Sequence, residues 1–449
     1  MLFSSNVFLF AFLPAILLCY YIVPRRFRTP VLLVFSLFFY GWGEPVYLFL
    51  MLGDILLNYA CGRWIEMDRA KGGTGRPGMV TGVVLNLLLL GFFKYANFFF
   101  GDLLPRIPLP IGISFYIFQS MSYVIDVYRK DAPVQRNVLT FGTYVTLFPQ
   151  LIAGPIVRYA DVAEMLETRK ENLSQFASGV LLFVVGLGKK VLLANTMGNL
   201  WNLLQAQTGT AAAWMGLIAY SLQIYFDFSG YSDMAIGLGR MFGFEFLINF
   251  NYPYISASIT EFWRRWHISL STWFREYVYI PLGGNRKGRR RHILNIVTVW
   301  LLTGLWHGAS WNYVLWGAFF AVFLIVEKLF LLKWLKKLPA LLRHGYTLLV
   351  VLLSFSIFYF EDMGAMGAFL VRLFTPASSA GAYGLMLGYL PMLVVSIVAA
   401  TPLLKNWAAK HAGSAALQWG RLLGAGALMV LCVAALASQS YNPFIYFRF

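Results

Sequence analysis

The chain has 449 residues, of which 59% are hydrophobic and only 12% are charged. Soluble domains carry about a quarter charged residues, so this composition excludes an ordinary soluble protein. The net charge of +17 would indicate a nucleic-acid partner only if it formed a basic face on a soluble domain. The basic residues lie instead in short loops between apolar runs, so we expect a membrane protein that binds membrane lipid and no nucleic acid.

Apolar runs of membrane-helix length recur along the whole chain. They predict an all-α, polytopic transmembrane bundle of roughly 10 to 12 membrane helices. We expect a single integral membrane domain over residues 1–449, with N-terminal helices in 1–130, a central region in 131–335 and C-terminal helices in 336–449. The expected helices cover residues 6–23, 31–43, 46–61, 79–99, 110–127, 139–156, 175–205, 213–240, 293–305, 309–333, 346–360, 383–402 and 422–439.

The loops between the first helices alternate in basic charge. Arg25, Arg26 and Arg28 follow the first run, whereas the next loop, "GWGEP", has no Lys or Arg; the third and fifth loops are again basic. Because basic loops stay in the cytoplasm, this alternation places the N-terminus on the extracytoplasmic side.

Polar residues interrupt several of these runs. "FQSMSYVIDVYR" carries Gln119, which we expect to support or line a cavity, and Pro149 and Pro155 should break the helix at 139–156. Asp227 and Asp233 lie in "YFDFSGYSDMAIG", six residues apart, so they do not share one helix face. Either could orient a histidine or pair with an arginine, and a purely structural ion pair is an equal alternative.

Between residues 242 and 285 the pattern changes to aromatics mixed with charged residues. The segment includes "EFWRRWHISLSTWF", with Trp263, Arg264 and His267. Polar or irregular backbone survives at membrane depth only inside protein or along a wet cavity, so we expect interfacial and re-entrant helices here. An interfacial helix with tryptophans at the lipid headgroups is the alternative, but it explains His267 less well than a functional role does.

The next loop, "GGNRKGRRRH" at residues 283–292, is the densest basic cluster and should be cytoplasmic. It lacks the Lys-Ser or Lys-Thr pair of a phosphate-binding P-loop. Two interpretations stay open: a topology anchor beside anionic lipid headgroups, or an electrostatic attraction for a phosphorylated acyl donor such as a coenzyme A thioester.

The stretch "LTGLWHGASW", residues 302–311, places His307 within an apolar run. His307 follows Arg291 by 16 residues, and a straight helix would carry it roughly 24 Å from the inner surface. An ionisable residue at that depth is a functional candidate by default. Neutral imidazole can take a proton from an alcohol, so we predict a catalytic base. Gly304 and Gly308 leave room for a close approach of another helix or of a substrate.

The quoted segments resemble the membrane-bound O-acyltransferase family. The resemblance rests on "NYPYISASITEFWRRWHISLSTWFREYVYIPLGGNR" and "LTGLWHGASWNYVLWG", and on "FSLFFYGWGEPVYLFLM" and "YFDFSGYSDMAIGLGRMFGF", which are similar to the bacterial branch that O-acetylates alginate. It implies helices around a central tunnel, an O-acetyltransferase activity and His307 as the catalytic residue, whereas the position of His267 is occupied by Asn or Asp in some branches of the family. It also implies a bacterial cytoplasmic membrane location and an exopolysaccharide acceptor, as in alginate biosynthesis, with a possible extracytoplasmic SGNH-type transferase as partner.

The residues and the resemblance together predict acyl transfer from a cytoplasmic thioester to a hydroxyl, with His307 and His267 as the catalytic residues. We expect His307 to deprotonate the acceptor and His267 to bind or polarise the acyl carbonyl, with Arg264 or Asp227 orienting these groups. Acetyl-CoA or another acyl thioester is the expected donor substrate, with no permanently bound cofactor and no metal site. The expected substrate-binding residues are Trp263, Arg264, Asp227, Asn295, Trp306, Ser310 and Gln119. A transporter or flippase for a lipid-linked sugar, a structural scaffold of an export complex and teichoic-acid D-alanyl transfer are the alternatives.

Overall fold

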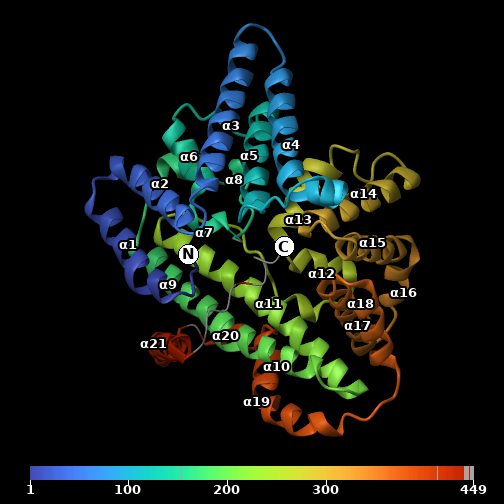
Figure 1. Cartoon of the computed structure of the whole chain (residues 1–449). Coiled ribbons are helices and arrows are strands. Elements are labelled where there is room, and N and C mark those ends of the chain that lie inside the picture. The colour runs from blue at the N-terminus through green and yellow to red at the C-terminus, as the bar shows by residue number, and fades with distance from the viewer. Residues whose placement is uncertain (153, 412, 439–443, 445–449) are drawn as a thin grey trace. The chain divides into compact units, whose positions relative to one another are not determined.

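A computed structural model describes residues 1–449 except 153, 412, 439–443 and 445–449; the side chain of Asp102 is also undescribed (Figure 1). The described part of the chain is helical and contains no strand, which confirms the predicted all-α class. It divides into two compact units, one of residues 1–184 and 231–247 and one of residues 185–230 and 248–449.

The first unit is built from apolar helices joined by short loops. α3 and α4 form a hairpin, and α5 packs against both (Figure 1). Phe148 follows a break in the expected helix 139–156, with Pro149 in the first turn of the new helix, as the proline predicts. The elements are η1 (Phe8–Phe12), α1 (Leu13–Ile22), α2 (Arg25–Gly41), α3 (Tyr47–Ala70), α4 (Arg76–Phe100), η2 (Gly101–Leu103), α5 (Ile113–Arg129), α6 (Val138–Thr146), α7 (Phe148–Leu151), α8 (Tyr159–Thr168) and the start of α9 (Leu173–Gly188).

The second unit holds both candidate histidines. Its elements before residue 288 are η3 (Lys189–Ala194), α10 (Asn195–Gln205), most of α11 (Thr210–Met241), η4 (Pro253–Ile255), α12 (Ile259–Arg265), α13 (Ile268–Phe274) and η5 (Arg275–Tyr279). The later ones are α14 (Arg289–His307), α15 (Trp311–Val326), η6 (Glu327–Leu331), α16 (Leu332–Leu335), α17 (Ala340–Tyr359), α18 (Met363–Phe374), η7 (Ala380–Ala382), α19 (Tyr383–Ala399), α20 (Leu403–Lys410) and α21 (Ala415–Ser438). The final residue of the expected helix 422–439 lies outside the described residues.

Seven helices of the described chain are long and apolar enough to cross a membrane. Ten to twelve crossings were expected; the other expected spans fall on helices that are shorter, as α5 with 17 residues, or more polar, as α11 with Asp227 and Asp233. The seven are Tyr47–Ala70, Arg76–Phe100, Leu173–Gln205, Trp311–Leu335, Ala340–Tyr359, Ala380–Ala399 and Ala415–Ser438.

The segment between α11 and α14 contains only short helices, as its mixed composition predicts. None of η4, α12, α13 and η5 exceeds seven residues. Trp263, Trp266 and Trp273 are nevertheless buried. A lipid-facing belt therefore does not describe these tryptophans; they pack inside the protein because the short helices fold back onto the longer ones.

Candidate active site

His307 is the last residue of α14 and is buried, with 5% of its surface exposed. Three aromatic rings pack edge-on against its imidazole: Trp306 and Trp316 at 5.0 Å and Phe358 at 5.3 Å between ring centroids. α14 runs unbroken from Arg289 to His307. The distance of His307 from the inner surface was calculated for one continuous helix, and the structure has that helix. The structure thus places this imidazole at the far end of α14 from the basic cluster, among aromatic side chains.

Glycines let α15 approach α14 closely at this end. A methyl group added to Gly304 would overlap the main-chain carbonyl of Tyr313, and one added to Gly308 would overlap the Tyr313 ring. The glycines were expected to admit either another helix or a substrate, and the structure shows that α15 is the element that approaches. Close packing of α15 fixes Trp316 against the imidazole, which orients the base that the sequence predicts.

His267 lies between α12 and α13 and is almost fully buried, with 1% of its surface exposed. Its backbone is left-handed, with φ 46° and ψ 53°, a conformation that is strained for a residue with a side chain. Asn249 holds it there: the main-chain oxygen of Asn249 accepts the N–H of Ile268 at 3.0 Å, and its side-chain oxygen accepts the N–H of Ser269 at 3.2 Å.

The contacts of Asn249 also determine the tautomer of His267. The Asn249 Oδ1 atom accepts from the Ser269 N–H and hydroxyl, so it is an acceptor toward the His267 Nδ1 at 3.1 Å as well. Nδ1 therefore carries the proton. Burial lowers the pKa of His267 well below its ordinary value, so the ring is neutral and Nε2 carries the lone pair.

The two histidines contact the same indole. The Trp306 ring lies 5.9 Å from the His267 ring and 5.0 Å from the His307 ring between centroids. Phe228 of α11 covers another edge of His267 at 4.6 Å. Residues separated by 40 positions in the sequence are thereby brought into one aromatic cluster, which is the central feature of the site.

Two indole N–H groups in this cluster are buried without an acceptor among the described residues, those of Trp263 and Trp316. Trp263 packs on Trp316 at 5.6 Å and on Trp300 at 4.5 Å between ring centroids. A buried donor without an acceptor costs free energy, and such exceptions in native proteins mark strain, bound water or a functional site. The cluster is therefore equipped to donate hydrogen bonds to a group that enters it.

The remaining predicted residues fall into different surroundings. Asn295 is buried and donates to the carbonyl of Gly284 at 2.8 Å, which ties the preceding loop to α14. Ser310 is half-buried at the start of α15. Arg264 is exposed. Gln119 belongs to the first unit, where its amide group is buried without a partner among the described residues.

Asp227 forms a buried ion pair with Lys190, 2.5 Å between carboxylate and ammonium. The pair joins α11 to η3 one residue before Phe228, the residue that covers His267. Of the alternatives left open for Asp227, the structural ion pair is the one seen, with a lysine as its partner. Lys190 was overlooked, although an ionisable residue inside the apolar run 175–205 was a signal that could have found it.

Asn249, Trp316 and Phe358 were also overlooked. Asn249 stood in the segment 242–285 that was expected to be unusual, but nothing in the sequence distinguishes it from Asn251 nearby. The polar stretches that hold His292, His344 and His411 predict solvated histidines in loops, but two of the three lie in helices. His292 is in the first turn of α14 and His344 is in α17, with its Nδ1 atom 3.1 Å from the main-chain oxygen of Ser256. Only His411, exposed after α20, matches that expectation.

No group of three or more histidine, cysteine, aspartate or glutamate side chains in the described part of the chain could hold a metal ion. The groups of the site that can take part in acid–base chemistry or hydrogen bonding are the two imidazoles and the indole N–H groups.

Comparison with known proteins places this site in a familiar context. Residues 127–363 match the model of the membrane-bound O-acyltransferase family, and both histidines lie within that range. The chain is 41% identical to a probable alginate O-acetylase of Pseudomonas putida over the full length of both. It is 35% identical to a peptidoglycan O-acetyltransferase of Helicobacter pylori over 73% of this chain and 70% of that protein. A teichoic acid D-alanyltransferase of Bacillus subtilis is 28% identical over 55% of this chain and 65% of that protein.

Proposed function

Because this chain belongs to the membrane-bound O-acyltransferase family and is a multi-pass membrane O-acyltransferase, we propose that it moves an acetyl group from acetyl-CoA toward a hydroxyl of an extracytoplasmic polysaccharide. The observation that carries the proposal is the cluster in which His267 and His307 contact the indole of Trp306. The full-length similarity to a probable alginate O-acetylase supports an acetyl group and an alginate-like acceptor over D-alanyl transfer, for which the related chain is similar over only about half of this one.

In this proposal His307 is the general base. Its imidazole takes the proton of the acceptor hydroxyl as that oxygen bonds to the thioester carbon. The tetrahedral intermediate then collapses, the carbon–sulfur bond breaks, and the proton on His307 passes to the leaving thiolate. The products are an acetyl ester and a free thiol. General base catalysis of this kind contributes roughly 10²–10⁴-fold to the rate.

The tautomer of His267 assigns it a different role. With Nδ1 protonated and donating to Asn249, the neutral ring presents an acceptor at Nε2. An acceptor suits a hydroxyl of the incoming substrate and cannot donate a hydrogen bond to an acyl carbonyl. The indole N–H groups of Trp263 and Trp316 are the donors better suited to the carbonyl oxygen as it gains charge. His267 is therefore a substrate-orienting residue in this mechanism.

The wider setting belongs to the same proposal. Basic loops and the relatives from bacteria support the bacterial cytoplasmic membrane with an extracytoplasmic N-terminus. A donor on the cytoplasmic side and a polysaccharide outside require the acetyl group to cross the membrane. An extracytoplasmic transferase of the SGNH type would complete the transfer if the final hydroxyl lies beyond the reach of this chain.

Transfer of radiolabel tests the proposal. Purified protein in detergent is incubated with acetyl-CoA labelled in the acetyl group and with an alginate oligosaccharide, and label in ester and in free acetate is counted. We expect label transfer or thioester hydrolysis that is lost in His307→Ala and kept in His411→Ala, the exposed matched control. Equal activity in the two variants would contradict a catalytic His307. Flux of a lipid-linked sugar in liposomes without label transfer would support the transporter alternative.

A further inference from the structure

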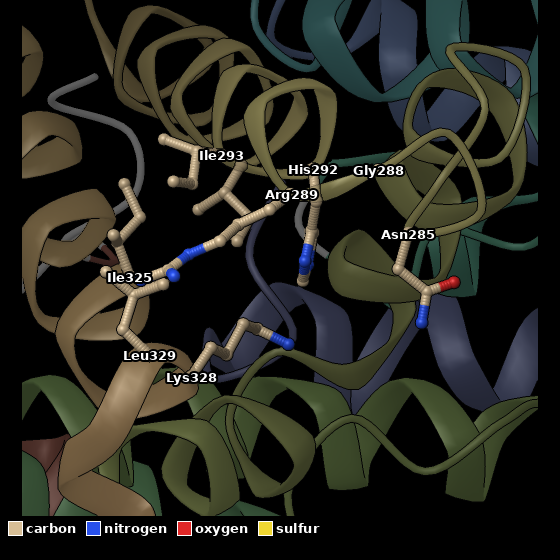
Figure 2. A pocket seen from close by; sticks show the side chains of 9 residues that line it. Asn285, Gly288, Arg289, His292, Ile293, Ile325, Lys328 and Leu329 are labelled. Atoms are coloured by element: carbon tan, nitrogen blue, oxygen red, sulfur yellow. The ribbon is translucent and has the colours of Figure 1, made fainter.

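A cavity of about 340 Å³ opens where the beginning of α14 lies beside the end of α15 and η6 (Figure 2). Polar and basic residues line part of the cavity: Arg289 and His292 from α14, Lys328 from η6 and Asn285 from the preceding loop. Apolar side chains line the rest, those of Ile293, Ile296, Ile325 and Leu329. The cavity lies at the end of α14 opposite His307, so it is separate from the aromatic cluster.

The basic side chains of this cavity form no ion pair with a carboxylate of the described residues. Neither Arg289 nor Lys328 has a carboxylate within ion-pair distance there. The acidic neighbour of Lys328 along the chain, Glu327, is already engaged: its oxygens accept the main-chain N–H groups at the start of α12, those of Ile259 at 2.7 Å and Thr260 at 2.8 Å.

A further cation adds to the excess. The Arg264 guanidinium lies close enough to Lys328 to act on it repulsively. Arg264 was expected to orient the reacting groups. In the structure its charge acts on Lys328, beside the cavity. Glu327 acts on Lys328 in the opposite, attractive sense, but Arg264, Arg289 and Lys328 together outnumber this one carboxylate, and an excess of positive charge creates a local potential that attracts an anion.

The cavity also offers hydrogen-bond donors. Figure 2 shows the His292 ring and the Lys328 ammonium directed into the same space, with the Arg289 side chain extending toward Ile325. The His292 Nε2 atom is buried without a partner in the described part of the chain. Burial and the Lys328 charge lower the pKa of His292, so near neutral pH this ring is an uncharged donor and acceptor.

We propose that this cavity is a phosphate-binding site for a ligand that joins a phosphate group to an organic portion. Two cationic side chains and the positive end of α14 match a phosphate anion, which arginine binds through paired N–H groups. The apolar wall then contacts the attached organic portion. Two sources carry this chemistry: the headgroup of an anionic phospholipid of the cytoplasmic leaflet, and the phosphates of a nucleotide-bearing thioester. The second source rests on the proposed function.

Binding measurements on the purified full chain test the site. The cavity variant is Arg289→Gln with Lys328→Gln; the matched control, Arg286→Gln with Arg290→Gln, removes the same two charges from exposed residues of the same cluster that do not line the cavity. One arm measures retention of dioleoylphosphatidylglycerol against dioleoylphosphatidylcholine by native mass spectrometry. The other measures the Kd of acetyl-CoA against S-acetylpantetheine, which lacks the nucleotide phosphates, by equilibrium dialysis.

We expect the cavity variant to weaken binding of one phosphate-bearing probe by about tenfold, the loss typical of a charge-assisted hydrogen bond or more. The control should change it by less than about twofold, because Arg286 and Arg290 do not line the cavity and act on its ligand only through screened solvent. Loss confined to phosphatidylglycerol assigns the lipid, and loss confined to acetyl-CoA assigns the donor. The charge-preserving variant Arg289→Lys with Lys328→Arg should retain most of the binding in either case.

Equal binding by the cavity variant and the control for both probes would overturn the phosphate site. That failure is distinct from failure of the proposed function, because binding is measured without turnover. If acetyl transfer depends on His307 while the cavity variant binds both probes normally, the site fails and the function stands. If the cavity binds phosphate but neither the unaltered protein nor any variant transfers acetyl, the site stands and the proposed function fails.

Discussion

Each unit contains one cluster of buried polar side chains among apolar helices, and the two clusters are built in opposite ways. In the first unit Asp54, Asn58, Asn86 and Ser120 bond to one another across α3, α4 and α5, with distances of 2.6 to 2.8 Å for the Ser120–Asp54, Asn86–Asn58 and Asn58–Asp54 bonds. Each donor there has an acceptor inside the cluster. This arrangement is typical of helix association in membranes.

In the second unit the buried polar groups are surrounded by aromatic rings. His307 contacts three rings, and two indole N–H groups nearby have no acceptor among the described residues. A closed network stabilises the fold and has no donor left for a ligand, whereas an open one is less stable and can bind. The comparison teaches that a structural cluster differs from a binding site in whether its buried polar groups have hydrogen-bond partners, and not in how many such groups it contains.

Replacing His307 by glutamine should have the largest effect on activity. Glutamine is similar in size and polar, but it cannot take a proton, so kcat should fall by roughly 10³-fold. The protein should elute and melt as the unaltered chain does, because the surrounding rings remain. Label transfer from acetyl-CoA measures the loss, and a decrease of less than about tenfold would argue against base catalysis.

Replacing Asn249 by alanine should cost roughly 10–100-fold in kcat, because it removes the acceptor that fixes the tautomer and the left-handed backbone of His267. The pH–rate profile separates this positioning role from mere destabilisation. Without the Nδ1 acceptor both tautomers become populated, and the profile should change in shape. Asn251→Ala, two residues away, is the control, and an unchanged profile in both variants would contradict the positioning role.

Trp316→Phe should lower kcat by about tenfold and leave KM nearly unchanged, if the indole N–H stabilises charge that develops on the carbonyl oxygen. Phenylalanine keeps the aromatic packing against His307 and removes only the donor. Trp214→Phe is a matched control, because the Trp214 N–H already donates to the Leu373 carbonyl at 2.8 Å. A similar loss in both variants would point to packing instead of hydrogen bonding.

Asn86→Ala in the first unit should have the smallest effect on catalysis. It leaves the Asn58 oxygen without its donor, so the free energy of unfolding in detergent should fall by about 1–3 kcal/mol. The kcat of the folded fraction should stay within about twofold of the original value, since the network is structural. A fall in kcat of the folded protein by much more than twofold would show that the first cluster is also part of the catalytic machinery, so the two clusters would no longer differ in role.

Much of this protein could be predicted from its sequence because the membrane imposes strong local rules. Apolar runs predicted the long helices: the expected span 79–99 is α4, 76–100, and the expected span 213–240 is α11, 210–241. The short helices α8, α12, α13, α18 and α20 had no such signal. Pro149 marked a break, and "LTGLWHGASW" identified His307 because an ionisable group in an apolar run is costly. These inferences need only neighbours along the chain.

Contacts between distant residues were decided by the tertiary structure alone. The meeting of His267 and His307 at Trp306, the support of His267 by Asn249 and the pairing of Asp227 with Lys190 join segments from 18 to 40 residues apart. The lysine that pairs with Asp227 could not be identified from the sequence for this reason. Hydropathy and residue spacing describe which face of a helix is apolar, but they do not specify which helix packs against it. The sequence thus determines the helices and the chemistry available, and packing decides which groups meet.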